Sequence, residues 1–138
     1  AFCRISDKPI VSRSDIYTPD AIVVLDPLLV TSPQILNGLK EGGYIIVNTK
    51  KTAEEIIKKL NFRATYGVLD ATDIALKKIN VPIPNTTILG ALVKLTKNVI
   101  TREGIKRAFE ERFQRLAEKN FEAFEEAFEK TTMEVFNG

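Results

Sequence analysis

The chain has 138 residues and a mass of 15.5 kDa, which is the size of one domain and excludes two large independent domains. Hydrophobic residues make up 44% and charged residues 28%, a globular composition that argues against a disordered tail, a collagen-like rod or a membrane bundle. The 20 Lys and Arg against 18 Asp and Glu leave a net charge of +2, too balanced for a dedicated nucleic-acid-binding protein. We therefore expect a single globular domain over residues 1–138 with no nucleic-acid partner.

Several residue types that active sites use are missing. The sequence has no His and no Trp, and Cys3 is its one cysteine. Without His, the Ser-His and Cys-His nucleophile pairs and the commonest metal ligand are excluded. A single Cys cannot hold a zinc ion or an iron–sulfur cluster, and it cannot form an internal disulfide. We therefore predict no catalytic residue and no metal ligand, and a protein of the reducing cytoplasm.

A membrane location is not expected either. No apolar run approaches the ~18 residues of a spanning helix, and no basic segment followed by an apolar run marks a signal peptide. The sequence therefore predicts no contact with a membrane.

The first 13 residues contain two short apolar segments around a turn at Asp7, Lys8 and Pro9. Asp followed by Pro is typical of a β-turn, so we predict an N-terminal hairpin. Because the chain starts at Ala1 inside an apparent strand, we expect an upstream segment to have been lost. Removal of an initiator Met before a small Ala is the alternative.

Three apolar runs, at residues 21–25, 44–47 and 64–69, alternate with helical patterns. The strand cores are apolar on both faces, as in parallel sheets that helices cover. Ser32 and Pro33 predict the start of a helix through Leu39, Thr52 and Glu55 form a capping box, and a third helix is expected over 73–79. The predicted class is α/β, a Rossmann-like parallel sheet covered by helices.

The remainder after Pro84 is predicted to be helical, over residues 85–95, 101–113 and 116–129, with no further strand. In the last segment large apolar side chains recur at helical spacing, at Phe113, Ala117, Phe121, Phe124 and Phe128. Two interpretations stay open: this Phe stripe packs on the sheet, or it forms a docking surface for a partner subunit.

The residues that follow the predicted strands are the first candidates for a site, because ligands approach the carboxyl ends of parallel strands. They are Asp26, Asn48, Thr49, Lys50, Asp70 and Thr72. Asp, Asn and Thr at such places are also the usual helix caps, so a structural role is the alternative. Lys50 and its neighbour Lys51 have no capping role, which favours contact with an anion.

A second candidate site is the turn Pro84, Asn85, Thr86 and Thr87, where Asn85 can cap a helix whose free N–H groups attract an anion. Plain capping is again the alternative. Gly90, inside the following helix, costs about 1 kcal/mol of helix stability against Ala, which predicts close packing against another backbone.

No glycine pattern of the GxGxxG or P-loop type is present, so the sequence contains no self-contained nucleotide site. No nucleophile stands beside a suitable base, which disfavours an independent hydrolase or transferase. A stand-alone Rossmann-like small-molecule-binding or regulatory domain remains possible from the residues alone.

A set of ordered segments resembles the gamma subunit of the 2-oxoacid:ferredoxin oxidoreductases, in particular pyruvate:ferredoxin oxidoreductase, also called pyruvate synthase. The segments are residues 16–20 with VVLDP (23–27), GLKEGGYIIVNTKK (38–51), DATDIAL (70–76), PIPNTTILGAL (82–92) and LAEKN (116–120). The family opens with a strand and a glycine-rich GRGGQG loop upstream of the equivalent of Arg4. This sequence lacks them, which supports the expectation of a lost N-terminal segment.

The resemblance implies oxidative decarboxylation of a 2-oxoacid with coenzyme A, giving an acyl-CoA and carbon dioxide and reducing ferredoxin. It implies companion subunits of the alpha, beta and delta type, which bind thiamine diphosphate, Mg and [4Fe–4S] clusters, while this chain binds no cofactor alone. The candidate residues for the rim of a coenzyme A channel or of a subunit contact are Asn48, Lys50, Lys51, Asn85 and Thr86.

Overall fold

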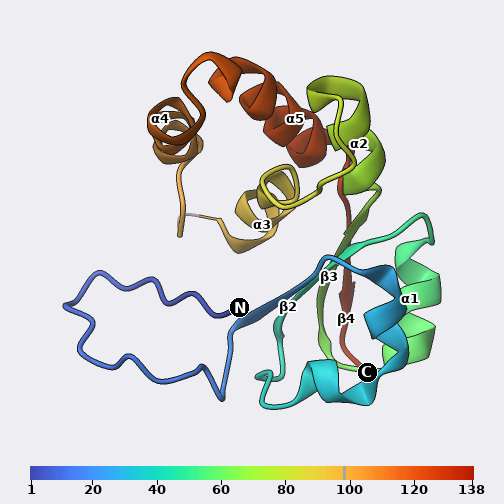
Figure 1. The fold of residues 1–138 in the computed structure, drawn as a ribbon. Helices are drawn as coiled ribbons and strands as arrows, with labels where there is room; N and C mark the ends of the chain where they lie inside the picture. The colour runs from blue at the N-terminus through green and yellow to red at the C-terminus, as the bar shows by residue number, and fades with distance from the viewer. Residues whose placement is uncertain (98) are drawn as a thin grey trace.

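The fold is built on a four-stranded sheet. The computed structural model describes residues 1–97 and 99–138, with only the backbone described at Pro33. The strands are β1 (Ala21–Val24), β2 (Gly43–Asn48), β3 (Ala64–Leu69) and β4 (Thr132–Phe136), in the spatial order β1-β2-β3-β4. The first three strands run parallel and β4 pairs antiparallel with β3 (Figure 1). The predicted α/β class with a parallel sheet is confirmed.

Helices cover both faces of this sheet. Helix α1 (Ala53–Leu60) packs on one face, where Ile56 joins Ile45 and Val47 of β2 in one buried cluster. Helix α3 (Leu89–Thr96) packs on the other face, where Ile46 meets Ala91 and Leu95. Alternate residues of β2 therefore point into different cores, which explains why the strand is apolar on both sides.

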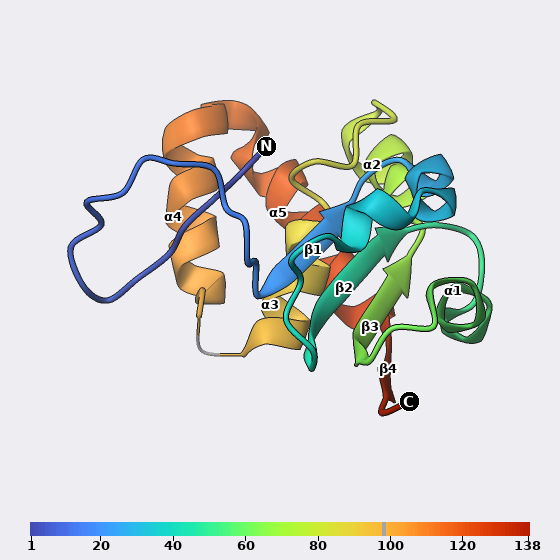
Figure 2. The same ribbon diagram turned by 90° about the horizontal axis from the view of Figure 1, so that it is seen from below.

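The remaining helices form a layer beyond α3. They are α2 (Ala71–Ile79), α4 (Arg102–Phe113) and α5 (Ala117–Lys130), with 3-10 helices η1 (Pro27–Thr31), η2 (Pro33–Leu36) and η3 (Gln114–Leu116) as connectors. Helix α5 contacts α2, α3 and α4, so it is the centre of this layer (Figure 2). None of the helices in the described residues is long and apolar enough to cross a membrane.

The prediction that no strand follows Pro84 is wrong, because β4 pairs with β3 as a fourth strand at the edge of the sheet. Its five residues are mostly exposed and include Glu134, so the segment lacks the apolar run that marked the other strands. Backbone pairing holds it in place, with Val135 opposite Thr65 and Phe136 opposite Ala64. An edge strand of this kind depends on a distant partner for its formation, which local pattern does not reveal.

The predicted N-terminal hairpin is also wrong. The chain before Ala21 contains no strand in the structure, and residues 1–15, the N-terminal arm, are all exposed. Figure 1 shows this arm as a wide loop that leaves the body of the molecule. A two-stranded hairpin without a sheet or core to pack on is marginal in water, so turn signals at Asp7 and Pro9 do not suffice.

Two predicted helices have other bounds. The segment from Ser32 forms only the short helix η2, and the Ser32 side chain makes no capping hydrogen bond. The segment from Asn85 forms turns up to Ile88, and the regular helix begins at Leu89. The capping box of α1 is confirmed, since the Thr52 hydroxyl accepts from the Glu55 N–H and the Glu55 carboxylate accepts from the Thr52 N–H.

The Phe stripe packs against helices rather than on the sheet. Phe124 is fully buried and meets Phe109 of α4 edge to face, with ring centroids 6.2 Å apart. Val93 of α3, Ile105 of α4 and Ala117 of α5 are buried in the same cluster, in which Phe121 and Phe128 are partly buried. The interpretation that placed the stripe on the sheet is therefore wrong, because α3 stands between α5 and the strands.

The prediction for Gly90 is confirmed. A Cβ atom at this position of α3 would lie 2.2 Å from the carbonyl oxygen of Phe124 and 2.7 Å from the amide nitrogen of Phe128. The backbones of α3 and α5 therefore touch at this point, and only glycine leaves room for it.

Candidate functional site

Asn48, at the carboxyl end of β2, connects the ends of all three parallel strands. Its Nδ2 donates to the carbonyl of Leu25 after β1 at 2.9 Å and to the hydroxyl of Thr72 in α2 at 2.8 Å. Its Oδ1 accepts from the N–H of Ala71 at 2.9 Å, at the start of α2. The residue is buried, with 5% of its surface exposed, and both amide hydrogens are used inside the chain. Asn48 thus holds together the edge of the sheet where the three parallel strands end, which we call the rim. Both of its amide hydrogens are used there, so it has no donor left for a ligand.

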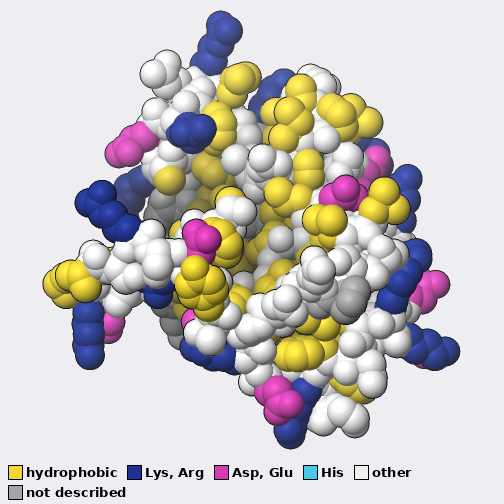
Figure 3. All heavy atoms as spheres, turned by 60° about the horizontal axis from the view of Figure 1, so that its bottom comes forward, with side chains coloured by type: hydrophobic (Ala, Val, Ile, Leu, Met, Phe, Trp, Pro, Cys, Tyr) yellow, Lys and Arg dark blue, Asp and Glu magenta, His cyan; other side chains and the backbone are white. Residues whose placement is uncertain are grey.

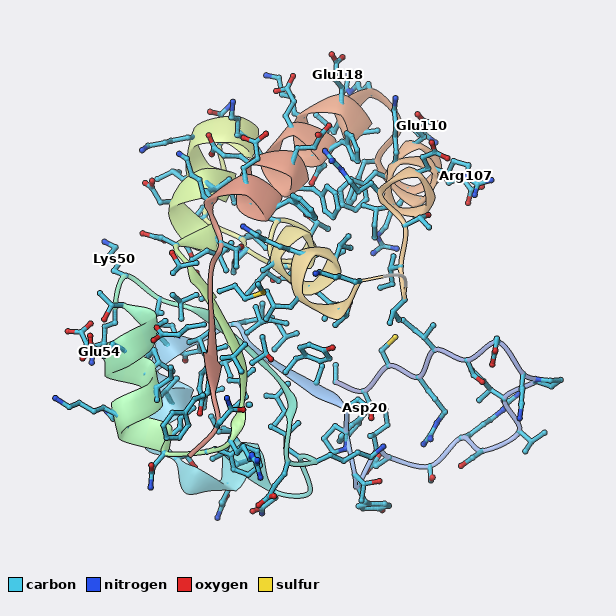
Figure 4. The ribbon with its side chains drawn as sticks, turned by 180° about the vertical axis from the view of Figure 1, so that it is seen from behind. Asp20, Lys50, Glu54, Arg107, Glu110 and Glu118 are labelled. Carbon is cyan, nitrogen blue, oxygen red and sulfur yellow. The ribbon has the colours of Figure 1, made fainter. Side chains whose placement is uncertain are left out.

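The three residues after Asn48 turn the chain toward α1. Thr49 is buried, donates its N–H to the carbonyl of Leu69 and accepts the N–H of Lys51 on its hydroxyl. Lys50 and Lys51 are exposed, and Lys50 points away from the molecule near the start of α1 (Figure 4). These two ammonium groups therefore stand on a rim that backbone and side-chain hydrogen bonds fix.

The two acidic residues of this rim are helix caps. The Asp26 carboxylate accepts the N–H of Leu28 at 3.0 Å, and the Asp70 carboxylate accepts the N–H of Asp73 at 3.1 Å. Both are the N-cap residues of the helices that follow them. The capping interpretation is thus confirmed for Asp26 and Asp70.

The second candidate, the turn before α3, is tied to α5. The Thr86 hydroxyl donates to Oδ1 of Asn120 at 3.0 Å, and Nδ2 of Asn120 donates to the carbonyl of Leu116 at 2.9 Å. Asn85 is exposed, whereas Thr87 is fully buried and its hydroxyl has no hydrogen-bond partner. Sequence pattern does not single out Asn120 as a site residue, because its partner lies more than thirty residues away and an Asn in a helix is usually solvated.

The two candidates lie on different sides of the sheet. Lys50 and Lys51 lead into α1, which packs on one face, and the turn 85–87 leads into α3, which packs on the other. The two candidates therefore do not form one pocket. The lining of the two cavities that the structure shows includes none of Lys50, Lys51, Asn85 and Thr86.

The titratable side chains that the structure describes lie mostly at the surface or in hydrogen bonds within the chain. In the described residues no three His, Cys, Asp or Glu side chains come together as a metal site. The charged side chains of Arg107, Glu110 and Glu118 point outward from α4 and α5 (Figure 4). Burial raises the pKa of the Tyr66 phenol, but its hydroxyl is engaged with the backbone of Phe62. The described residues thus form an α/β domain whose polar rim lies at the carboxyl ends of its parallel strands.

Comparison with known proteins agrees with this class. The family model described as pyruvate ferredoxin/flavodoxin oxidoreductase matches residues 1–130. The common gamma subunit of the pyruvate/ketoisovalerate oxidoreductases of Thermococcus litoralis is 47% identical over 135 residues, which is 96% of this chain and 72% of that protein. Pyruvate synthase subunit PorC of Thermotoga maritima is 46% identical over 113 residues, 82% of this chain and 58% of that protein.

Solved structures show the same fold. The crystal structure of pyruvate oxidoreductase subunit PORC from Thermotoga maritima matches with a TM-score of 0.78 and 40% identity, over 86% of this chain and 66% of that chain. The keto/oxoacid ferredoxin oxidoreductase gamma subunit of Geobacter sulfurreducens matches with a TM-score of 0.68 and 26% identity, over 91% and 66%. The chain belongs to the pyruvate ferredoxin/flavodoxin oxidoreductase family, among its gamma-type subunits, and spans roughly two thirds of the solved relatives.

Proposed function

We propose that this chain is the gamma subunit of a multisubunit 2-oxoacid:ferredoxin oxidoreductase of the pyruvate synthase type. In this role it belongs to an enzyme that decarboxylates a 2-oxoacid with coenzyme A and passes the electrons to ferredoxin. The observation that carries the proposal is the 47% identity to a gamma subunit over 96% of the chain. The subunit itself holds no catalytic residue, and the companion subunits supply thiamine diphosphate, Mg and the [4Fe–4S] clusters.

The exposed apolar surface supports membership of an assembly. Large hydrophobic side chains are exposed along the N-terminal arm and around β1, among them Phe2, Val11, Tyr17 and Leu28, the last 75% exposed. Figure 3 shows hydrophobic side chains gathered around a hollow between this arm and the helices. Apolar surface of this extent is typical of a protein that buries it against other chains or other segments.

The name of the Thermococcus relative describes a subunit that pyruvate and ketoisovalerate oxidoreductases share. For this chain the same arrangement means that the choice of 2-oxoacid is made by companion subunits. The two cavities that the described residues show agree with this, because neither combines buried polar groups with an apolar pocket for a small oxoacid.

We assign to Lys50 and Lys51 a role at the rim of the coenzyme A channel, with Asn85 and Thr86 as hydrogen-bonding groups of a second rim segment. The two exposed ammonium groups stand on a fixed turn at the carboxyl ends of the strands, where ligands of α/β proteins approach. Asn48 positions this turn through its bonds to Leu25 and Ala71. The holoenzyme is assigned to the cytoplasm.

Purification from the native source tests the subunit role. Co-elution of this chain with thiamine-dependent, iron-containing subunits, and with 2-oxoacid and coenzyme A dependent reduction of ferredoxin, is the expected result. A chain that elutes as a monomer and binds a nucleotide by itself would instead be a stand-alone Rossmann-like domain.

A further inference from the structure

A groove beside β4 is separate from both candidate rims. It encloses about 430 Å³ at the place where α3 ends and α4 begins. This volume lies in the range of pockets that bind ligands or partner side chains. The groove is lined by Val93, Lys94, Lys97, Ile100, Thr101, Arg102, Phe128 and Met133.

The floor of the groove is apolar and continues along β4. Met133 is 46% exposed and Val135 is 58% exposed, although both belong to a strand of the sheet. They alternate along the strand and therefore point to the same face, while Glu134 between them points to the other. Strand β4 is the last in the sheet order, so among the described residues no strand pairs with its outer edge.

The rim of the groove is positively charged. The Arg102 guanidinium lies 5.0 Å from the centre of the Phe128 ring, and the Lys94 ammonium lies 6.0 Å from it. Lys94 also donates to the carbonyl of Thr131 at 2.8 Å, at the carboxyl end of α5, which fixes its charge in place.

One of the three cations on this rim has a carboxylate partner, since Arg102 pairs with Glu125. No ion pair of the described residues reaches Lys94 or Lys97. Lys97 has a φ of 26°, a conformation that side chains other than glycine rarely adopt and that costs free energy. The groove is thus an apolar surface with an unbalanced positive rim, and it fits a ligand that is apolar and anionic.

We propose that this groove is the docking site for an extended, carboxylate-rich segment of a companion subunit. The segment adds along the outer edge of β4, places an apolar side chain on Phe128 and Met133, and pairs its carboxylates with Lys94 and Lys97. A polypeptide fits better than a small anion, because the apolar strip extends past the cavity to Val135 and the strand edge offers backbone N–H and C=O groups. The inference rests on the proposed role as a subunit.

Zero-length carbodiimide cross-linking of the purified complex tests the pairing directly, because it joins a lysine only to a carboxylate in contact with it. We expect mass spectrometry to find Lys94 or Lys97 joined to an Asp or Glu of a companion subunit. Lys58 and Lys59, exposed on α1 at the opposite face of the sheet, serve as internal controls without such a link. Links from Lys94 and Lys97 that lead only to carboxylates of this chain would overturn the proposal.

Charge reversal supplies a second test. We expect Lys97→Glu to weaken association with the companion subunits about tenfold and to make the remaining association less sensitive to salt, whereas Lys58→Glu leaves both unchanged. Lys97 lies in an exposed loop, so this variant keeps the fold, and Met133→Asp repeats the test on the apolar floor. If Lys97→Glu associates as tightly as the unaltered chain, the proposal is wrong. If in that case the unaltered chain binds succinate and Lys97→Glu does not, the groove is a site for a small anion.

The subunit role and the docking groove can be disproved separately. If the chain does not co-elute with any thiamine-dependent subunit, the proposed function is wrong. If it co-elutes and Lys97→Glu associates as tightly as the unaltered chain, only the docking groove is wrong.

Discussion

The amide of Asn48 donates a 2.8 Å hydrogen bond to the hydroxyl of Thr72, and this bond links the end of β2 to the first turn of α2. The same amide group reaches the carbonyl of Leu25 beyond β1. One buried side chain therefore sets the relative position of the three strand ends that form the rim. The sequence suggests Asn48 as a ligand contact, whereas in the structure its side chain fixes the rim that carries Lys50 and Lys51.

Replacement of Asn48 by Ala is expected to destabilise the domain by about 3 kcal/mol, because it leaves the Leu25 carbonyl and the Ala71 N–H without partners in a buried place. Urea unfolding of the isolated chain measures this loss. Lys50→Ala, two residues away and exposed, is the matched control and should change the free energy of unfolding by less than about 0.5 kcal/mol. Equal stability of Asn48→Ala and the unaltered chain would show that the network does not bear on the fold.

The two threonines before α3 are expected to respond oppositely to Val. Thr87→Val removes a fully buried hydroxyl that has no partner, so the free energy of unfolding should stay the same or rise by up to about 1 kcal/mol. Thr86→Val removes the donor to Asn120 and should lower it by about 1 kcal/mol.

Thermal and urea unfolding of the two variants and the unaltered chain measure these differences in the free energy of unfolding. A Thr87→Val variant that is less stable than Thr86→Val would mean that the Thr87 hydroxyl has a partner in solution.

The sequence predicts the parts of this fold whose formation is local. The β2 and β3 runs are apolar on both faces, and the Thr52 capping box marks α1, so these elements and the α/β class follow from short segments. Strand β4 does not follow, because its partner in β3 lies more than sixty residues earlier in the chain. The predicted hairpin fails for the converse reason, since its turn signals have no sheet to pack against.

For the candidate site, too, one part can be predicted from the local sequence and another cannot. The position of Lys50 and Lys51 after a strand is local information, and the structure places them on the rim as exposed groups. Tertiary contacts decide the other partners. The Asn48 amide donates to the Leu25 carbonyl and the Thr72 hydroxyl, and the Thr86 hydroxyl donates to Asn120. Sequence pattern names the polar residues of the rim, and only the fold separates those that face solvent from those that hold the chain together.

Tyr66 is expected to make stability depend on pH at the alkaline end. Burial holds the pKa of its phenol above the ordinary 10.0, so the folded chain keeps the proton to higher pH than the unfolded chain does. The contribution is fully present below the unfolded value and is lost as pH rises through the folded one. The free energy of unfolding of the unaltered chain should therefore fall more steeply than that of Tyr66→Phe as the pH rises above about 10, the ordinary pKa of the phenol.

The variant itself should be less stable at neutral pH by about 1–2 kcal/mol, because the hydroxyl donates to the Phe62 carbonyl at 2.6 Å and accepts the Phe62 N–H. Lys77, whose pKa is raised because its ammonium donates a hydrogen bond to the Asp73 carboxylate, also titrates at alkaline pH, but it does so in both proteins and cancels in the difference. If the free energies of unfolding of the two proteins change with pH in parallel, burial does not raise the pKa of the Tyr66 phenol.

Gly90→Ala is expected to destabilise the chain by about 2 kcal/mol or more, although Ala is the better helix former by about 1 kcal/mol. The added methyl group would overlap the Phe124 carbonyl of α5. Gly104→Ala, in the first turn of α4, is the matched control, because its new methyl meets only the Thr101 hydroxyl at 3.0 Å. A gain in Tm for Gly90→Ala would contradict the close approach of α3 and α5.

The double variant Lys50→Ala with Lys51→Ala tests the coenzyme A rim. Loss of two ammonium groups should raise the KM for coenzyme A in the reconstituted holoenzyme about tenfold, because at the proposed rim they contact the phosphates of coenzyme A. The KM for the 2-oxoacid should stay unchanged, because in the proposed function the companion subunits bind the 2-oxoacid. Lys58→Ala with Lys59→Ala is the matched control, since it removes another exposed lysine pair from the far end of α1, the helix that follows Lys51. An unchanged KM in the first variant, or an equal rise in both, would contradict the rim assignment and leave the subunit role intact, because that role rests on co-elution with the companion subunits.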